Sequence, residues 1–401
     1  MSRHNRRRSS RRRRLTIGAA GVLAAAAAAT SVTVASARET HPRGDTAKAD
    51  HAVFVQGDEL DGNTIHVFKR GGGGELTAVG RYATGGRGGD QLDAPTDSLA
   101  SQGSLVYDDR SGRLLAVNAG SGTVTSFRVR GQRLTDRQVV RSGGDFPSSI
   151  AVSGRLAYVM NAGGAGSVQG FRITAEGLAP LRGSHRSLGL DNRKVPLFSS
   201  SPGQLAFAPG GGQLVVTTKS ANTIEVFPVR QDGRPSRRAV INDSAGGVPF
   251  AITFDRAGRM LVAEAKNSTV STYKVRTDGT LDVVQKPLPN GQKTLCWLER
   301  AGDFFYGGNT GSSTVTGYRT DRQGRLALTT GDGVATPPSA TARGVIDLAV
   351  TKDESFLYVQ NATSGTVEGF RVGGNGSLTK VTTVTGLPSF AESGMEGIAA
   401  V

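Results

Sequence analysis

The sequence has almost no cysteine. Cys296 is the only one among 401 residues, so the chain cannot form an intramolecular disulfide and must be stabilised by its core. A catalytic thiol needs a histidine and groups that stabilise the thiolate, whereas Cys296 stands beside Trp297 in an apolar segment. We therefore interpret Cys296 as a small buried core residue.

Histidine and the common cofactor motifs are also scarce. None of the five histidines has further His, Cys or Asp residues near it at the spacing of metal ligands. A Gly-x-Ser-x-Gly motif does not occur either. The four glycines at 71–74 lack the lysine and the following helix of a phosphate-binding loop. We expect neither a metal site nor a bound cofactor.

The positive charge is concentrated at one end of the chain. Of the formal net charge of +15, eight charges come from arginines that precede the first apolar run. The remaining excess is spread along the chain without a dense Lys/Arg cluster, which is typical of a solvated surface rather than of one that follows a phosphate backbone. We expect no nucleic-acid partner.

Residues 1–37 have the pattern of a signal peptide. A cationic start is followed by an apolar stretch from Leu15 and by the small-residue site Ala35-Ser36-Ala37. The arginines at 11–14, directly before a weakly hydrophobic segment, favour the twin-arginine export route, with the general secretory route as the alternative. We expect a secreted protein without membrane association after cleavage, because no later run is apolar enough to span a bilayer. An uncleaved segment would instead be an N-terminal anchor. Residues 38–50 are polar and are predicted to form a disordered linker.

A short motif recurs seven times within residues 51–401. It consists of a small polar residue, Thr or Ser, a β-branched residue, two variable positions and an aromatic. The copies begin at Asn63, Gly122, Gly166, Asn222, Ser268, Ser313 and Gly365. Spacings of about 44 to 59 residues are typical of propeller blades. An apolar strand precedes each copy, and a turn and a polar strand follow it. The sequence therefore predicts an all-β fold, a seven-bladed β-propeller with four antiparallel strands per blade.

The two ends of this region predict how the ring closes. Residues 51–55 match the second strand of a blade, and residues 396–401 match a first strand. An unpaired first or last blade would expose sheet edges. We therefore expect the C-terminal strand to join the N-terminal blade, which gives one cooperative ring and, in our interpretation, a monomer.

The repeat resembles the lactonase-like propellers over residues 51–401. The resemblance rests on turns such as Asp255-Arg256-Ala257-Gly258-Arg259 before an apolar strand, on an Asn at the end of that strand, and on the closure. This family includes bacterial 6-phosphogluconolactonases and fungal carboxymuconate-lactonizing enzymes. The resemblance implies a lactonase or a lactonizing cycloisomerase, if the protein is an enzyme.

The family's catalytic motifs are divergent in this chain. The resemblance implies His-Pro-His and Gly-Pro-Arg-His stretches at the start of two inner strands, but Ser201-Pro202-Gly203 and Val248-Pro249-Phe250 stand there. Asn309-Thr310-Gly311 replaces a further arginine of the family. Only Glu264 matches an acidic functional position of the family. The resemblance therefore supports the fold more strongly than it supports the activity.

Aligning the seven inner strands places one residue per blade at the mouth of the channel. The predicted substrate-binding ring is Gln102, Ser149, Gln204, Phe250, Trp297, Asp347 and Glu396. Such a mixture suits a small polar ligand held against an apolar wall, although channel mouths also tolerate polar residues without any ligand.

The residues at the ends of the second strands of the blades form a second ring. Most of them are Asn, and Glu264 is the exception. We expect Lys219 near Glu264, either as a site pair with Glu264 as the catalytic acid or base or as a plain ion pair. The leading hypothesis is a small lactone or sugar-acid ligand in the central funnel. The alternative is a non-catalytic scaffold that binds a protein or a cell-wall polymer.

Overall fold

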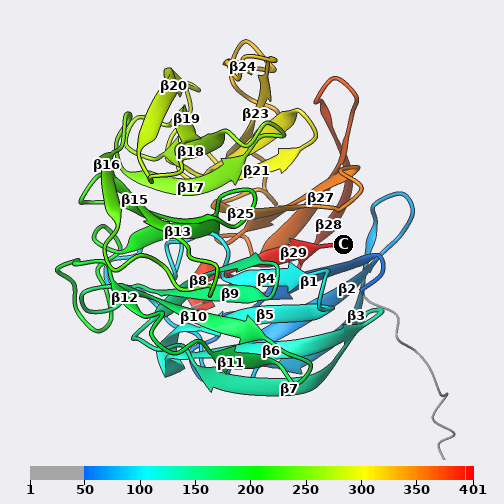
Figure 1. The fold of residues 1–401 in the computed structure, drawn as a ribbon. Helices are drawn as coiled ribbons and strands as arrows, with labels where there is room; N and C mark the ends of the chain where they lie inside the picture. The colour runs from blue at the N-terminus through cyan, green and yellow to red at the C-terminus, as the bar shows by residue number, and fades with distance from the viewer. Residues whose placement is uncertain (1–48, 393) are drawn as a thin grey trace, which may run out of the picture. The chain divides into compact units, whose positions relative to one another are not determined.

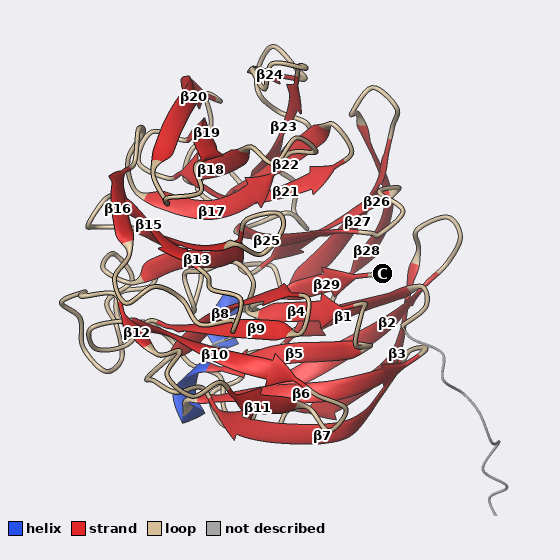
Figure 2. Ribbon diagram, viewed as in Figure 1, coloured by secondary structure: helices blue, strands red, loops and turns tan. Residues whose placement is uncertain are grey.

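Strands and the loops between them make up nearly all of the described chain. The computed structural model describes residues 49–392 and 394–401. The predicted signal peptide and residues 38–48 of the predicted linker lie outside the described residues. Within the described residues, the only helices are the short 3-10 turns η1 (Ala119–Ser121) and η2 (Phe390–Glu392) (Figure 2). No helix there is long and apolar enough to cross a bilayer.

The strands form seven separate antiparallel sheets, and each sheet runs from an inner strand to an outer strand (Figure 1). In that direction, the first is β29 (Ile398–Ala400), β1 (Ala52–Gln56), β2 (Thr64–Arg70) and β3 (Leu76–Ala83), and the second is β4 (Leu105–Asp108), β5 (Arg113–Asn118), β6 (Thr123–Arg130) and β7 (Arg133–Arg141). The third is β8 (Pro147–Ser153), β9 (Leu156–Asn161), β10 (Ser167–Ile173) and β11 (Leu178–Pro180), with the short β12 (Arg186–Ser187) also on β10. The fourth is β13 (Pro202–Phe207), β14 (Gln213–Thr218), β15 (Thr223–Pro228) and β16 (Val240–Asp243).

The remaining three sheets follow the same order. The fifth is β17 (Pro249–Phe254), β18 (Met260–Glu264), β19 (Thr269–Val275) and β20 (Leu281–Pro289), and the sixth is β21 (Leu295–Ala301), β22 (Phe304–Asn309), β23 (Thr314–Thr320) and β24 (Leu326–Leu328). The seventh is β25 (Val345–Val350), β26 (Phe356–Asn361), β27 (Thr366–Val372) and β28 (Leu378–Val384). Each inner strand contacts the inner strands of the two neighbouring sheets, and β29 contacts both β25 and β4, so the seven blades form a closed ring. The predicted seven-bladed propeller is confirmed.

The predicted closure is confirmed as well. Strand β29 pairs antiparallel with β1, and Val53, Phe54 and Val55 lie opposite Ala400, Ala399 and Ile398. This blade is therefore built from both ends of the described propeller, which removes the two sheet edges that an open ring would expose.

The side chains of each strand point alternately to its two faces, which explains why neighbouring blades pack against each other. In β1, Phe54 packs with residues of the second blade, whereas Val53 and Val55 pack with residues of the seventh. Successive side chains of a strand point to opposite faces, and both faces of a blade are covered by neighbours, so its middle strands are apolar at almost every position.

Candidate functional site

The inner strands begin with irregular backbone. Register shifts occur between Pro147 and Ser149 in β8, between Pro202 and Leu205 in β13, and between Leu295 and Trp297 in β21. β17 and β25 have similar shifts near their starts. A bulge turns the side chains at the start of a strand away from the alternation that the rest of the strand follows. The residues of the predicted ring therefore do not share one orientation.

A segment of the chain itself fills the predicted mouth of the channel. Residues 97–102, which lead from β3 toward β4, are each at most 4% exposed. We call residues 97–102 the plug. Ala100 within it adopts a positive φ of 48°, which bends the segment sharply.

Four blades hold the plug by hydrogen bonds. The Lys219 ammonium donates to the Ala100 carbonyl at 3.0 Å, and the Trp297 indole donates to the Ser101 carbonyl at 3.4 Å. The Leu99 N–H donates to the Glu396 carboxyl at 3.3 Å, and the Ser101 hydroxyl donates to the carbonyl at 148 at 2.7 Å. Contacts from blades around the ring show that the plug crosses the channel. A ligand cannot occupy the predicted mouth while the plug is in place.

Three charged side chains are buried around the plug. Lys219 is 2% exposed, and its ammonium lies 4.7 Å from the ring centre of Phe198 and 5.2 Å from that of Phe250. Burial lowers the pKa of Lys219 to about 8, although the negative charge of Asp97 raises it. Burial raises the pKa of Asp97 and of Glu396, and the charge of Asp97 raises the pKa of Glu396 further. Lys219 thus serves the plug and does not face an open funnel.

Glu264 also has a different environment from the one expected. It is fully buried, and one oxygen accepts bonds from Ser244 Oγ at 2.7 Å and from the N–H at 246 at 2.9 Å. Its other oxygen accepts from Thr269 Oγ1 at 2.9 Å and Ser271 Oγ at 2.8 Å. All of these donors belong to its own blade or to the loop that leads into that blade, and no ion pair with Lys219 forms among the described residues. The geometry does not support Glu264 as a catalytic base.

The neighbouring blade explains the role of Glu264. Asn309, at the same position of the sixth blade, donates to Thr314 Oγ1 at 3.1 Å and to Thr316 Oγ1 at 2.9 Å. These hydroxyls lie five and seven residues further along the chain, as do Thr269 and Ser271 from Glu264. Glu264 therefore replaces an Asn that ties the second strand of a blade to its third strand, which is a structural role.

Below the plug the channel opens into a cavity of about 260 Å³. Its walls are residues of the inner strands β4, β8, β25 and β29, and four polar side chains lie in its lining: Gln102, Gln204, Glu299 and Asp347. Val106, Tyr107, Val350 and Ala400, toward the ends of the inner strands, are partly exposed, whereas the strand starts are buried. The cavity is thus entered from the face opposite the plug.

Hydrogen bonds fix the polar end of this cavity. The Gln102 amide donates to Glu299 Oε1 at 2.8 Å and to the Leu298 carbonyl at 3.2 Å. Gln204 Oε1 accepts the Ile252 N–H, and among the described residues its amide nitrogen has no hydrogen-bond partner. Gln204 can therefore offer two N–H donors to a ligand.

Two carboxyls of the cavity have perturbed acidity. Burial raises the pKa of Glu299 to about 7, although hydrogen bonds from the Arg300 N–H and the Gln102 amide lower it. Burial, and next the charge of Glu299, raise the pKa of Asp347 well above its ordinary range. Carboxyls whose pKa is raised inside a cavity are candidates for acid–base chemistry.

The structure divides the predicted ring into two groups. Gln102, Gln204 and Asp347 line the cavity, whereas Phe250, Trp297 and Glu396 pack against the plug or its anchors. Ser149 belongs to neither group and links the plug to the fourth blade. Its hydroxyl donates to the Gln102 carbonyl at 2.6 Å and accepts from the N–H at 205 at 3.2 Å. Among the described residues, no three His, Cys, Asp or Glu side chains lie close enough together to hold a metal ion.

Sequence reasoning missed Glu299. The signal was present, because Glu299 follows Trp297 by two residues in an inner strand and so points to the same side of that strand. It is also the only carboxylate in the sequence Leu-Cys-Trp-Leu-Glu-Arg-Ala of β21.

No family model matches the sequence, and no curated protein matches it significantly. Solved structures do match. A Lactobacillus plantarum protein is 17% identical with a TM-score of 0.64, and the match covers 84% of this chain and 97% of that chain. A Bacteroides uniformis protein, provisionally named as a 6-phosphogluconolactonase, is 17% identical with a TM-score of 0.62, and the match covers 84% and 98%. The periplasmic gluconolactonase of Pseudomonas aeruginosa is 20% identical with a TM-score of 0.60, and the match covers 84% and 98%.

The chain has the fold of lactonase-like propellers. At these identities the likeness concerns the fold alone, so the activities named for those proteins remain theirs. The match extends over nearly their whole length, which fits the sequence resemblance and its divergence at the catalytic motifs.

Proposed function

We propose that this protein is a lactonase that binds a small, uncharged lactone of a sugar acid in the cavity below the plug. The observation that carries the proposal is a pair of carboxyls, the partly buried Glu299 and the buried Asp347, in the lining of a cavity on the propeller axis. The lactonase-like fold of the chain supports the same class of reaction.

The reaction needs one base and one acid. The Glu299 carboxylate accepts a proton from a water molecule as the water oxygen attacks the lactone carbonyl carbon. The carboxylic acid of Asp347 then donates its proton to the ring oxygen as the carbon–oxygen bond breaks. The free amide N–H groups of Gln204 stabilise the negative charge that develops on the carbonyl oxygen. Water is consumed, and a hydroxy acid is formed.

Charge in the cavity determines which lactones fit. A neutral ring meets hydrogen-bonding groups and an apolar wall, whereas a phosphorylated ring would bring a dianion beside Glu299 and Asp347. The ring-opened carboxylate product is repelled by the same groups, which favours its release. We expect unphosphorylated lactones to react faster than phosphorylated ones.

The test is a hydrolysis assay with glucono-1,5-lactone and 6-phosphogluconolactone. Glu299→Gln should lower kcat by about 10²- to 10⁴-fold, and Asp347→Asn by a similar factor, because general acid–base assistance has this size. Glu75→Gln, at an exposed turn far from the cavity, is the matched control. With Glu299 as the base, activity should rise with pH through about 7. Faster hydrolysis of the phosphorylated lactone, or full activity of Glu299→Gln, contradicts the proposal.

The plug favours a second candidate function. With the predicted mouth closed, the face that carries the plug has no open axial funnel, as expected for a non-catalytic scaffold that binds a protein or a cell-wall polymer. Absence of turnover with every lactone, together with retention on purified cell walls, would support this candidate instead.

We also propose export by the twin-arginine route, on the sequence pattern alone. Replacing the arginines at 11–14 should retain the precursor in the cytoplasm of a host that has this route. Normal export of that variant, or of the native precursor in a host without the route, would count against it.

A further inference from the structure

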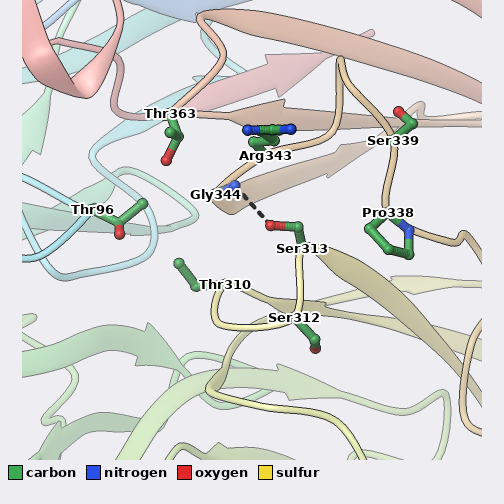
Figure 3. Close-up of a pocket in the computed structure, with 9 residues that line it drawn as sticks. All are labelled: Thr96, Thr310, Ser312, Ser313, Pro338, Ser339, Arg343, Gly344 and Thr363. Atoms are coloured by element: carbon green, nitrogen blue, oxygen red, sulfur yellow. Dashed lines mark hydrogen bonds between the residues drawn. The ribbon is translucent and has the colours of Figure 1, made fainter.

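A second pocket lies on the plug side of the propeller, away from the axial cavity. It has a volume of about 510 Å³ and lies between the loop that joins β22 to β23 and the chain that enters β25 (Figure 3). Its residues are Thr96, Thr310, Ser312, Ser313, Pro338, Ser339, Arg343, Gly344 and Thr363. Nothing in the proposed lactone chemistry uses this pocket.

The lining has one charge sign. Arg343 is the only charged residue of the lining, and among the described residues no hydrogen bond or ion pair engages its guanidinium. Six of the other eight residues carry hydroxyls. Figure 3 shows the guanidinium on the same side of the pocket as Thr363 and Gly344, with Thr96 and Thr310 across from it. A guanidinium among hydroxyl donors is a typical environment for an oxyanion.

The backbone holds this arrangement in place. The Arg343 N–H donates to Ser364 Oγ at 3.4 Å, and its carbonyl accepts the Thr363 N–H at 3.1 Å. The Gly344 N–H donates to Ser313 Oγ at 3.1 Å. A Cβ at Gly344 would lie only 2.3 Å from Thr363 Oγ1 and 2.7 Å from Thr96 Cγ2, so glycine keeps the space between the two threonines open.

Thr96 connects this pocket to the plug. It directly precedes Asp97, the first plug residue, whose carboxylate accepts the Ala100 N–H at 2.6 Å. A ligand that bonds to Thr96 therefore restrains the start of the plug.

We propose that this pocket binds the oxyanion group of a small ligand, a carboxylate or a phosphate, through Arg343 and the hydroxyls of Thr96 and Thr363, and that binding stabilises the plug. The inference is independent of the lactonase proposal, since it concerns other residues and needs no turnover.

The test is isothermal titration calorimetry with gluconate and with inorganic phosphate, at an ionic strength held constant with chloride. We expect saturable binding of at least one probe. Arg343→Gln should weaken it about 10- to 100-fold, because a charge-assisted contact is lost. Thr96→Val should weaken it about fivefold, because one neutral hydrogen bond is lost. The exposed Arg322→Gln, on a turn of the sixth blade, removes the same charge elsewhere and should leave affinity unchanged.

The two probes separate the possible sources of the oxyanion. Gluconate binding alone assigns the pocket to a hydroxylated carboxylate, and phosphate binding alone assigns it to a phosphate group. Glu299→Gln should bind as the wild type does, which separates this pocket from the channel. The bound probe should also slow hydrogen exchange in residues 97–102. Unchanged affinity in Arg343→Gln, or no saturable binding of either probe, would overturn the proposal.

Discussion

Replacing Glu299 by Gln should make the protein more stable at alkaline pH and leave it unchanged at acidic pH. Burial raises the pKa of the Glu299 carboxyl from the ordinary value of 4.5 to about 7, so the folded protein resists its ionisation. Gln is uncharged at every pH and keeps an oxygen that can accept the Gln102 amide bond. The substitution therefore removes the cost of a partly desolvated charge and preserves the local contacts.

The size and the pH range of the effect follow from linkage. Below about pH 4.5 the carboxyl is protonated in both the folded and the unfolded chain, so Glu and Gln behave alike. Between pH 4.5 and 7 the unfolded chain releases the proton while the folded chain retains it, so wild-type stability falls as the pH rises. Above pH 7 both states are ionised and the difference stays constant, at up to about 3 kcal/mol.

Urea unfolding at pH 4.5, 6, 7 and 8 measures this difference. Trp297 is the only tryptophan, is 1% exposed and lies 5.2 Å from the Phe250 ring, so its fluorescence reports on the folded inner strands. The advantage of Glu299→Gln should grow from nearly zero at pH 4.5 to its full value at pH 8, and Glu75→Gln should show no such growth. An advantage that is constant with pH, or that shrinks as the pH rises, would refute the assigned environment of Glu299.

Three further changes test the fold and the revised roles of single residues. Deleting residues 396–401 removes β29 and should lower the free energy of unfolding by at least about 3 kcal/mol, measured by urea unfolding, because β1 loses its partner and Ile398 leaves the core. A melt like that of the intact chain would contradict the closure. Glu264→Ala should cost about 3 kcal/mol or more, since several buried donors lose their acceptor, while Glu264→Gln should cost clearly less. Equal costs would argue against the structural role. Cys296 is buried and its thiol pKa is raised by burial, so a thiol reagent should label it only in the unfolded protein; rapid labelling of the native protein would show that this site opens.

The propeller was predictable because its signal is repeated and local. Each blade carries the same order of turn, apolar strand, small polar motif and aromatic, and the unmatched strands at the two ends leave one way to close the ring. The pairing of Val53 with Ala400 follows from this count. Repetition averages out the uncertainty of any single strand.

The channel was less predictable because the plug is built by distant contacts. Ala100 and Lys219 are 119 residues apart, and Ser101 and Trp297 are 196 apart. Nothing local in residues 97–102 indicates burial, since their anchors come from four blades. The bulges at the starts of the inner strands also obscure the alignment: Leu205 and Ile252 occupy corresponding places in their blades, so Phe250 stands one position before the place that Gln204 holds.

Glu264 shows how a repeated position can mislead. Its family match and its charge favoured a catalytic role, but the hydroxyls five and seven residues later occur beside Asn309 as well. A carboxylate and an amide can each engage two hydroxyls, one as an acceptor and the other as a donor, because a hydroxyl does both. The spacing of these hydroxyl residues in the sequence, rather than the charge of Glu264, indicated its structural role.

The plug determines from which face each site can be used. The plug brings its own Asp97 near the buried Lys219 of the fourth blade, and these charges are costly to bury and compensate each other only when the plug is seated. Lifting the plug would leave Lys219 without the Ala100 carbonyl and without Asp97. The closed arrangement is therefore strongly favoured over a partly open one. On the proposed function, a lactone would therefore reach Glu299 from the opposite face, and an oxyanion in the second pocket would influence the channel through Thr96 and the plug.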